Sequence, residues 1–174
     1  EPELVEVGKR RGWQIYPRTY ESTLEPNTVP VIYRYAWDID SEYFMHIHAT
    51  NPLLSIETID RAMEKFEDVS HDGLVAVLKR QTFYFRQNGE LVNNFAGTEE
   101  QKWTFETKLV EPLYELAHAI YIWKASNVRE HARLFFNPPY LFEIPPEEFV
   151  DIDYPWQWRL AELQYRERNA PAKK

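Results

Sequence analysis

Two aspartates separated by one residue are the strongest candidates for chemistry in this sequence. Asp151 and Asp153 flank Ile152 near the end of the chain. Residues 150–153 are predicted to end a strand, in which alternate residues project to one side, so both carboxylates can face one cation. Mg²⁺ is usually held by one or two carboxylates and completes its shell with water and substrate phosphate. The pair therefore predicts a magnesium site; the alternative is a strand end with solvated acids.

A second polar segment follows an aromatic and aliphatic run that predicts a buried strand over residues 43–49. It contains His48, Thr50 and Asn51, and a predicted helix begins soon after it. Open α/β sheets bind ligands where a strand ends and a helix begins. Hydroxyl, amide and backbone N–H groups are available there. The alternative is a turn in which Pro52 fixes φ and the next helix is capped.

Histidines and aromatic residues provide further candidates. His46 and His48 lie two residues apart, but no third ligand stands at a spacing typical of zinc sites. Tyr121, Phe135 and Phe136 can line an apolar wall, although aromatic residues in strands and at helix ends usually belong to the core. Neither G-x-G-x-x-G nor G-x-x-x-x-G-K-[ST] occurs, which excludes a Rossmann dinucleotide loop and a P-loop.

The composition narrows the class of protein. With 20 Lys and Arg against 28 Asp and Glu, the formal net charge is −8, which argues against binding to a nucleic-acid backbone. The 44% hydrophobic content supplies a core. There is no cysteine, no apolar run long enough for a membrane span and no signal peptide, so we expect a cytoplasmic protein without membrane partners.

Strands and helices alternate along the chain, which predicts an α/β fold with a mainly parallel sheet. The predicted strands cover residues 13–16, 43–49, 73–78, 119–123, 140–144 and 150–153. The predicted helices cover residues 2–11, 31–37, 55–66, 126–134 (capped by Ser126) and 156–168. Between them, Asn88-Gly89 predicts the turn of a hairpin over residues 82–93, followed by a loop over 96–108.

Three segments, in order, resemble motifs of the acylneuraminate cytidylyltransferase family. Residues 47–54, IHATNPLL, resemble L-Q-P-T-S-P-L-R; residues 111–122, EPLYELAHAIYI, resemble E-P-x-Y-x-x-N-G-A-x-Y-I; residues 151–155, DIDYP, with LAE at 160–162, resemble D-I-D-T-P-E-D followed by L-A-E. Three ordered matches at sensible spacing are more specific than any one of them.

The resemblance implies a Rossmann-like nucleotidyltransferase, a three-layer α/β sandwich in a single domain over residues 1–169, with a flexible tail at 170–174. It implies a homodimer formed through an excursion from the sheet at residues 81–112. The implied reaction couples CTP to the anomeric hydroxyl of a sialic, or nonulosonic, acid and releases pyrophosphate, with Mg²⁺ neutralising charge. By position, the metal would be held by Asp151 and Asp153, the nucleotide by Arg18, Thr50 and Asn51, and the sugar by His48, Tyr121, Phe135 and Phe136.

The sequence also departs from the family pattern. The sugar-binding Gln of the family is His48, its N-G pair is Ala117-His118, and its T-P-E-D is residues 154–157, YPWQ. Glu1 corresponds to a point beyond the family's phosphate-binding loop, so the resemblance predicts an N-terminally truncated fold with weak or no affinity for CTP. The departures leave two alternatives: a non-catalytic descendant that acts in binding or oligomeric assembly, or a metal site that serves a different sugar or nucleotide.

Overall fold

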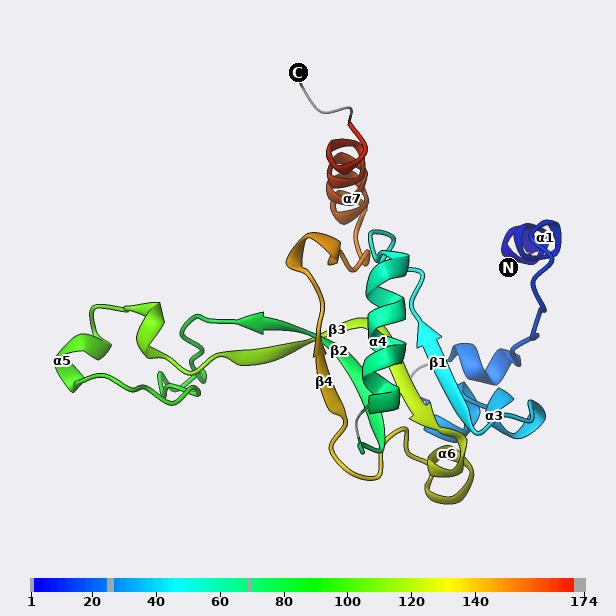
Figure 1. Ribbon diagram of the computed structural model, residues 1–174, viewed down its shortest axis with the longest axis horizontal. Helices are drawn as coiled ribbons and strands as arrows, with labels where there is room; N and C mark the ends of the chain where they lie inside the picture. Colours follow the sequence, from blue (N-terminus) through cyan, green and yellow to red (C-terminus); the bar gives the residue numbers. More distant parts are fainter. Residues whose placement is uncertain (1, 25–26, 69, 171–174) are drawn as a thin grey trace. The chain divides into compact units, whose positions relative to one another are not determined.

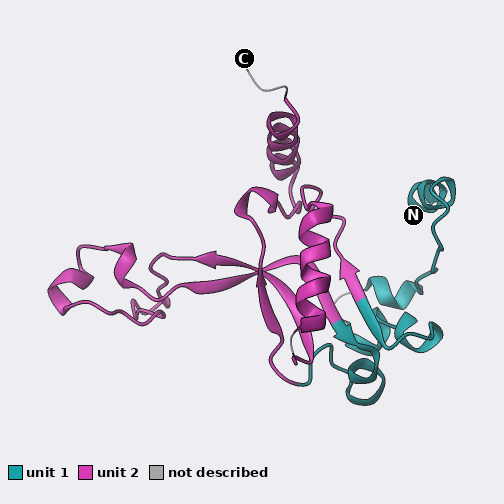
Figure 2. Cartoon of the chain, viewed as in Figure 1, with its two compact units in different colours: residues 1–44, 123–136 teal, residues 45–122, 137–174 magenta. Residues whose placement is uncertain are grey.

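The computed structural model describes residues 2–24, 27–68 and 70–170, and the chain divides into two compact units (Figures 1 and 2). Unit 1 contains residues 1–44 and 123–136, and unit 2 contains residues 45–122 and 137–174. The single domain predicted over residues 1–169 stays a prediction, and residues 171–174 of the predicted tail lie outside the described residues. No helix in the described ranges combines the length and the apolar character needed to span a membrane.

A sheet with the strand order β1-β3-β2-β4 forms the centre of the fold. The strands are β1 (Tyr43–Ile47), β2 (Gly73–Arg80), β3 (Leu113–Lys124) and β4 (Tyr140–Glu143). β2 and β4 pair in parallel, with Leu74 opposite Tyr140, whereas β3 runs opposite to β1 (Figure 1). The α/β class is therefore confirmed, but the sheet is mixed, because the strand that returns from the excursion is inserted against the direction of β1.

The core of unit 2 lies between this sheet and α4 (Ile56–Asp68). Every residue of β2 from Gly73 to Leu78 is buried, as expected for a continuous apolar run covered on both faces. On α4, Ala62 is fully buried, and Ile59 and Phe66 pack against the same cluster. Ile59, Ala62 and Phe66 therefore mark the face that α4 turns to the sheet. Ile56 (72% exposed) and Met63 (47% exposed), which belong to the same helical spacing, lie outside the core.

The N-terminus of α4 is held by two side chains. Ser55 Oγ accepts a hydrogen bond from the Thr58 N–H (3.1 Å), and Glu148 Oε2 accepts one from the Ser55 N–H (3.0 Å). Arg168, at the end of α7 (Pro155–Arg168), lies 4.0 Å from Glu148 Oε1 and donates to the Leu53 carbonyl (2.8 Å). These bonds fasten the far end of α7 to the start of α4.

The predicted hairpin is confirmed within residues 81–112, which we call the arm. Phe85 and Leu91 form an antiparallel bridge, and Gly89 has a φ of 85°, which a side chain would disfavour. Further along, the predicted loop contains a short helix, α5 (Glu99–Lys102), with a capping box between Thr98 and Gln101. In Figure 1 the arm leaves the sheet between β2 and β3.

Unit 1 is built around aromatic residues. Its helices are α1 (Pro2–Arg10), α2 (Val29–Ile32), α3 (Tyr35–Asp38) and α6 (Ala125–His131). Trp123 is fully buried and stacks on Phe44 at 4.9 Å, with Tyr33 edge-on at 5.5 Å. Arg129 of α6 donates to the carbonyls of Ala36 (2.6 Å) and Ile39 (3.1 Å), which joins α6 to α3.

Three local predictions were wrong. Residues 13–16 are exposed and form no strand, because the segment after Gly12 pairs with no neighbouring strand in the described chain. The N-cap of α6 is Lys124 rather than Ser126, since β3 runs directly into the helix. Residues 150–153 are not a strand, so the proposed alternation of Asp151 and Asp153 does not apply.

Glu148 provides a test of how α4 is held. Burial raises the pKa of this carboxyl, but hydrogen bonds from Ser55 and Thr58 and the charge of Arg168 outweigh burial, so its pKa lies below 4.5. A lowered folded-state pKa contributes stability above the unfolded pKa, and this stability is lost as the pH falls through the folded value. We expect Glu148→Gln to reduce the free energy of unfolding by about 1–2 kcal/mol at pH 7, measured by urea denaturation.

The exposed neighbour Glu147 supplies the control, because Glu147→Gln makes the same chemical change outside this network. The difference between the two variants should shrink below pH 4.5. Equal stability of both variants at pH 7 would contradict the assignment.

Candidate functional site

The three motif segments meet at the end of β1, and a buried asparagine joins them. Asn51 is 3% exposed, and its Nδ2 donates to the His118 carbonyl (3.1 Å) and lies 3.4 Å from Asp151 Oδ1. Two backbone hydrogen bonds join the same segments. The His48 N–H donates to the Ala119 carbonyl (3.0 Å), and the Ile152 N–H donates to the Thr50 carbonyl (3.0 Å). Segments up to 100 residues apart in the chain are therefore held together by hydrogen bonds.

Asp151 and Asp153 both line a hollow of about 360 Å³ beside the start of α7, which we call the Asp151 hollow. Its lining is formed by Glu115, Leu116, His118, Phe149, Val150, Asp151, Asp153, Trp156, Gln157 and Leu160. Gln157 fixes the loop, since its Oε1 accepts hydrogen bonds from the N–H groups of Asp153 (2.8 Å) and Tyr154 (2.6 Å). Both residues therefore line the hollow from a loop beside a helix N-terminus rather than from a strand, and the predicted shared orientation of their carboxylates stays a prediction.

His118 occupies a strained position at the wall of the Asp151 hollow. Its φ is 47°, within the left-handed region that favours glycine. Its Nδ1 lies 2.7 Å from the hydroxyl of Tyr121, which is 8% exposed. The family motif that this segment resembles has glycine at this place, and glycine adopts this conformation without the strain that histidine meets.

His48 extends the cluster on the side of β1. Its ring stacks on that of His46 at 4.5 Å and lies 5.4 Å from the ring of Tyr121. Burial lowers the pKa of His48, His118 lowers it further, and the Asp151 carboxylate opposes both. The net shift is downward, so His48 is neutral at pH 7 and offers a hydrogen-bonding imidazole rather than a positive charge.

The carboxylates of the Asp151 hollow suit a magnesium ion better than a transition metal. Among the described residues no group of three or more His, Asp or Glu side chains is arranged to hold a metal ion, and structural zinc sites use four ligands. Mg²⁺ needs only one or two carboxylates, with water and substrate completing the shell. The donor set of Asp151 and Asp153 fits that requirement.

The remaining predicted residues belong to unit 1. Arg18 donates from Nε to Ser22 Oγ (3.1 Å) and also to the Ser22 carbonyl. Its charge partly offsets the rise in pKa that burial causes in Tyr33. Phe135 is half-buried, and Phe136 is 56% exposed with its ring 4.7 Å from that of His131. The roles predicted for these three residues stay predictions.

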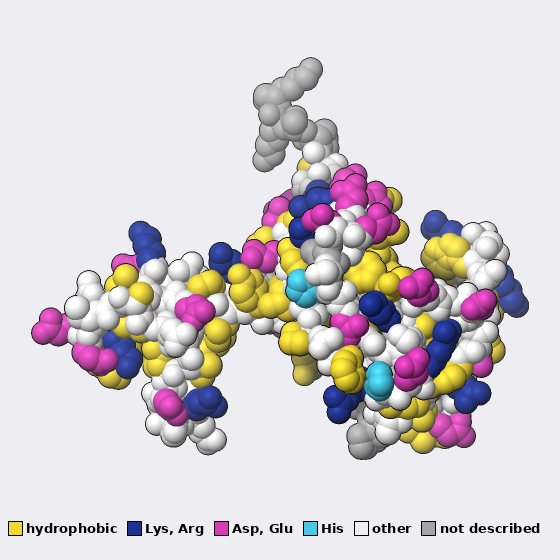
Figure 3. Space-filling view, turned by 60° about the horizontal axis from the view of Figure 1, so that its bottom comes forward, with side chains coloured by type: hydrophobic (Ala, Val, Ile, Leu, Met, Phe, Trp, Pro, Cys, Tyr) yellow, Lys and Arg dark blue, Asp and Glu magenta, His cyan; other side chains and the backbone are white. Residues whose placement is uncertain are grey.

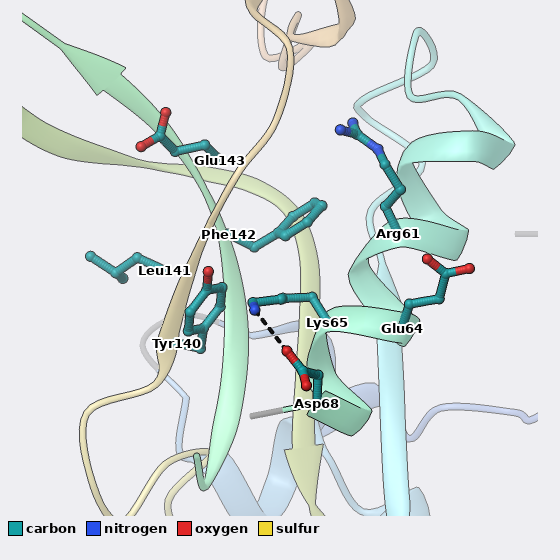
Figure 4. A pocket seen from close by; sticks show the side chains of 8 residues that line it. All are labelled: Arg61, Glu64, Lys65, Asp68, Tyr140, Leu141, Phe142 and Glu143. Atoms are coloured by element: carbon teal, nitrogen blue, oxygen red, sulfur yellow. Dashed lines mark hydrogen bonds and ion pairs between the residues drawn. The ribbon is translucent and has the colours of Figure 1, made fainter. Parts of the chain in front are cut away.

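A second hollow, of about 590 Å³, lies between α4 and β4 (Figure 4). Its cations are already engaged: Lys65 pairs with Asp68 (3.0 Å) and lies 5.5 Å from the centre of the Tyr140 ring, and Arg61 lies 5.9 Å from that of Phe142. β4 is the edge strand, and Pro138-Pro139 and Pro145-Pro146 on either side discourage pairing with another strand. This hollow is therefore a weaker candidate for a ligand.

The comparisons with known proteins give one distant similarity. No family model matches the chain. The chain is 26% identical over 187 residues to post-translational flagellin modification protein B of Campylobacter coli, in an alignment that covers 98% of this chain and 76% of that protein. The similarity extends over the described units rather than over a short motif, and it is too low to assign the family.

Sequence reasoning missed several residues that line the Asp151 hollow. From the sequence, His118 stands out only as a departure from the family motif, and Trp156 only as part of residues 154–157 and as the start of the helix predicted over residues 156–168. The available signal was the same in both cases: a substitution inside an otherwise matching motif. Glu115 carries no such signal, since its place in the hollow depends on β3 reaching back to Leu113.

The strain at His118 predicts that a glycine variant at this position is more stable than an alanine variant, which is the reverse of the usual order within a strand. His118→Ala and His118→Gly both remove the imidazole, but only alanine keeps a Cβ at positive φ. We expect the glycine variant to be more stable by about 1 kcal/mol in urea denaturation. Alanine is normally the more stable residue within a strand. An alanine variant at least as stable as the glycine variant would therefore contradict the left-handed conformation.

Proposed function

We propose that this chain is a sugar cytidylyltransferase of the CMP-nonulosonate type, with a Rossmann-like nucleotidyltransferase fold. The observation that carries the proposal is the junction at Asn51, where the three segments that resemble family motifs meet through the His118 carbonyl and Asp151. Motifs that matched by chance would have no reason to meet in space. The distant similarity to a flagellin modification protein also supports this proposal.

In this proposal the chain's own residues bind and orient the reactants. Asp151 and Asp153 would hold Mg²⁺, which would supply charge neutralisation at the α-phosphate of CTP. In unit 2, Thr50 and Asn51 contact the nucleotide, and His48 and Tyr121 border the sugar acid. The contacts predicted for Arg18, Phe135 and Phe136 of unit 1 stay predictions. The anomeric hydroxyl attacks the α-phosphorus and loses its proton to solvent, the bond from the α-phosphorus to the bridging oxygen breaks, and pyrophosphate leaves.

The substitutions within the motifs favour a second candidate function. His48, Ala117-His118 and residues 154–157 alter the sugar side of the site rather than the scaffold. A non-catalytic descendant that binds a ligand or assembles into an oligomer would tolerate such changes. It would keep the junction at Asn51, because that junction holds the fold together, and would lose turnover.

Pyrophosphate release separates the two candidates. Because the sequence predicts weak or no affinity of this chain for CTP, the assay uses saturating CTP. If the chain is a transferase, it releases pyrophosphate from CTP, N-acetylneuraminic acid and Mg²⁺ under these conditions, and Asp151→Asn reduces the rate by about 100-fold or more because the metal loses a charged ligand. The exposed Asp60 on α4 supplies the control, since Asp60→Asn makes the same change away from the hollow. No release with a folded protein at saturating substrates would favour the non-catalytic descendant.

We also propose that the arm forms a homodimer interface. It carries large exposed apolar side chains, among them Trp103 (62% exposed) and Phe105 (54%), and Figure 3 shows hydrophobic surface on the projection at the left. Within the arm, Phe83, Phe85 and Phe105 contact one another through their rings but remain partly accessible. A hairpin with so small a core gains stability when a partner covers it.

If the arm forms the dimer interface, a substitution within the arm should change the oligomeric state. We expect a dimer by light scattering, and we expect Trp103→Glu to shift it to monomer, because a charge would be buried in the interface. Trp13 in unit 1 is also 62% exposed, so Trp13→Glu is the matched control and should leave the dimer intact. A monomeric wild-type protein, or dissociation of the dimer by both substitutions, would contradict the proposal that the arm forms the dimer interface.

A further inference from the structure

Helix α7 carries more exposed aromatic surface than its packing explains. Only Ala161 is buried on this helix, whereas Trp156 is 61% exposed and Trp158 is 63% exposed. The two tryptophans line different hollows: Trp156 borders the Asp151 hollow, and Trp158 borders an apolar hollow of about 260 Å³ with Leu53 and Tyr165. Trp156 therefore stands beside several polar groups, whereas the hollow beside Trp158 is apolar apart from Glu162 and Tyr165.

The Asp151 hollow combines an apolar wall with hydrogen-bonding groups. Trp156 and Leu160, one helical turn apart on α7, form the apolar wall. Glu115, Asp151 and Asp153 supply carboxylates, of which Glu115 is paired with Arg80 at 2.5 Å. His118 is exposed, lines the hollow and lies 2.7 Å from the Tyr121 hydroxyl through Nδ1.

We infer that the Asp151 hollow is a binding site for a single hydroxyl-rich sugar ring, with Trp156 as the surface on which the ring stacks. A pyranose has an apolar C–H face that packs on an aromatic ring and hydroxyl groups at its rim. Carboxylates accept hydrogen bonds from hydroxyls, and the imidazole of His118 donates or accepts one. The volume of about 360 Å³ lies near the lower end of typical small-molecule sites, which suits one ring.

This inference rests on the proposed function for the identity of the sugar, and it adds a residue and a place that the family motifs do not supply. Because the hollow is acidic, an anionic sugar acid enters it together with a divalent cation held by Asp151 and Asp153, whereas the metal-free hollow repels it. Nucleobase stacking on Trp156 is the competing use of the same ring.

The test is a titration of the full chain, without nucleotide, followed through the indole N–H signals of its tryptophans by NMR. The probes are N-acetylneuraminic acid with and without MgCl₂, and cytidine. We expect the sugar acid to shift the Trp156 signal only when MgCl₂ is present. Trp156→Ala should weaken its binding by about tenfold, as the loss of one aromatic contact implies.

Trp158→Ala is the matched control, because it removes an equally exposed tryptophan two residues along the same helix, and it should change the affinity by less than twofold. Trp156→Phe should recover most of the affinity, which separates stacking from a folding defect. Equal effects of Trp156→Ala and Trp158→Ala, a shift of Trp156 by cytidine alone, or no response to the sugar acid with MgCl₂ would overturn the inference.

The result of this titration can be distinguished from the result of the pyrophosphate-release assay that tests the proposed function. Sugar-dependent shifts without any pyrophosphate release would retain the sugar site and reject the transferase. Pyrophosphate release with an unchanged KM for the sugar in Trp156→Ala would retain the transferase and reject Trp156 as the stacking surface.

Discussion

The buried side chain of Asn51 is the contact on which the candidate site depends. Its amide nitrogen reaches the His118 carbonyl and the Asp151 carboxylate, so one residue joins the end of β1, the middle of β3 and the loop before α7. Its Oδ1 is buried and has no hydrogen-bond partner among the described residues. Leaving a buried polar atom without a hydrogen bond costs about 1–3 kcal/mol. The other contacts at the junction must offset this cost.

The strain at His118 belongs to the same junction. A left-handed residue in β3 turns its carbonyl to the Asn51 amide and its side chain to the rim of the Asp151 hollow. Strained residues persist where the surrounding structure fixes them, and they are concentrated at functional sites. Histidine at this left-handed position places an imidazole at the rim of the hollow, where the motif that the segment resembles has glycine.

Much of the fold could be predicted from local patterns, because α4, β2 and the Asn88-Gly89 turn each have a strong signal in their own residues. The site could be predicted only in part. Asp151 and Asp153 share a hollow, as expected, but through a loop fixed by Gln157 rather than through a strand. The roles of His118 and Trp156 depend on a backbone angle and on helix packing, neither of which the residue types reveal.

The central claim is that Asp151 and Asp153 hold a divalent cation where the three motif segments meet. Manganese replaces magnesium at oxygen-rich sites and scatters X-rays anomalously, so crystals grown with MnCl₂ test the claim directly. The account predicts an anomalous peak bound by Asp151 and Asp153 in the Asp151 hollow, lost in Asp151→Asn. A peak at other carboxylates alone, or none at saturating MnCl₂, would contradict it.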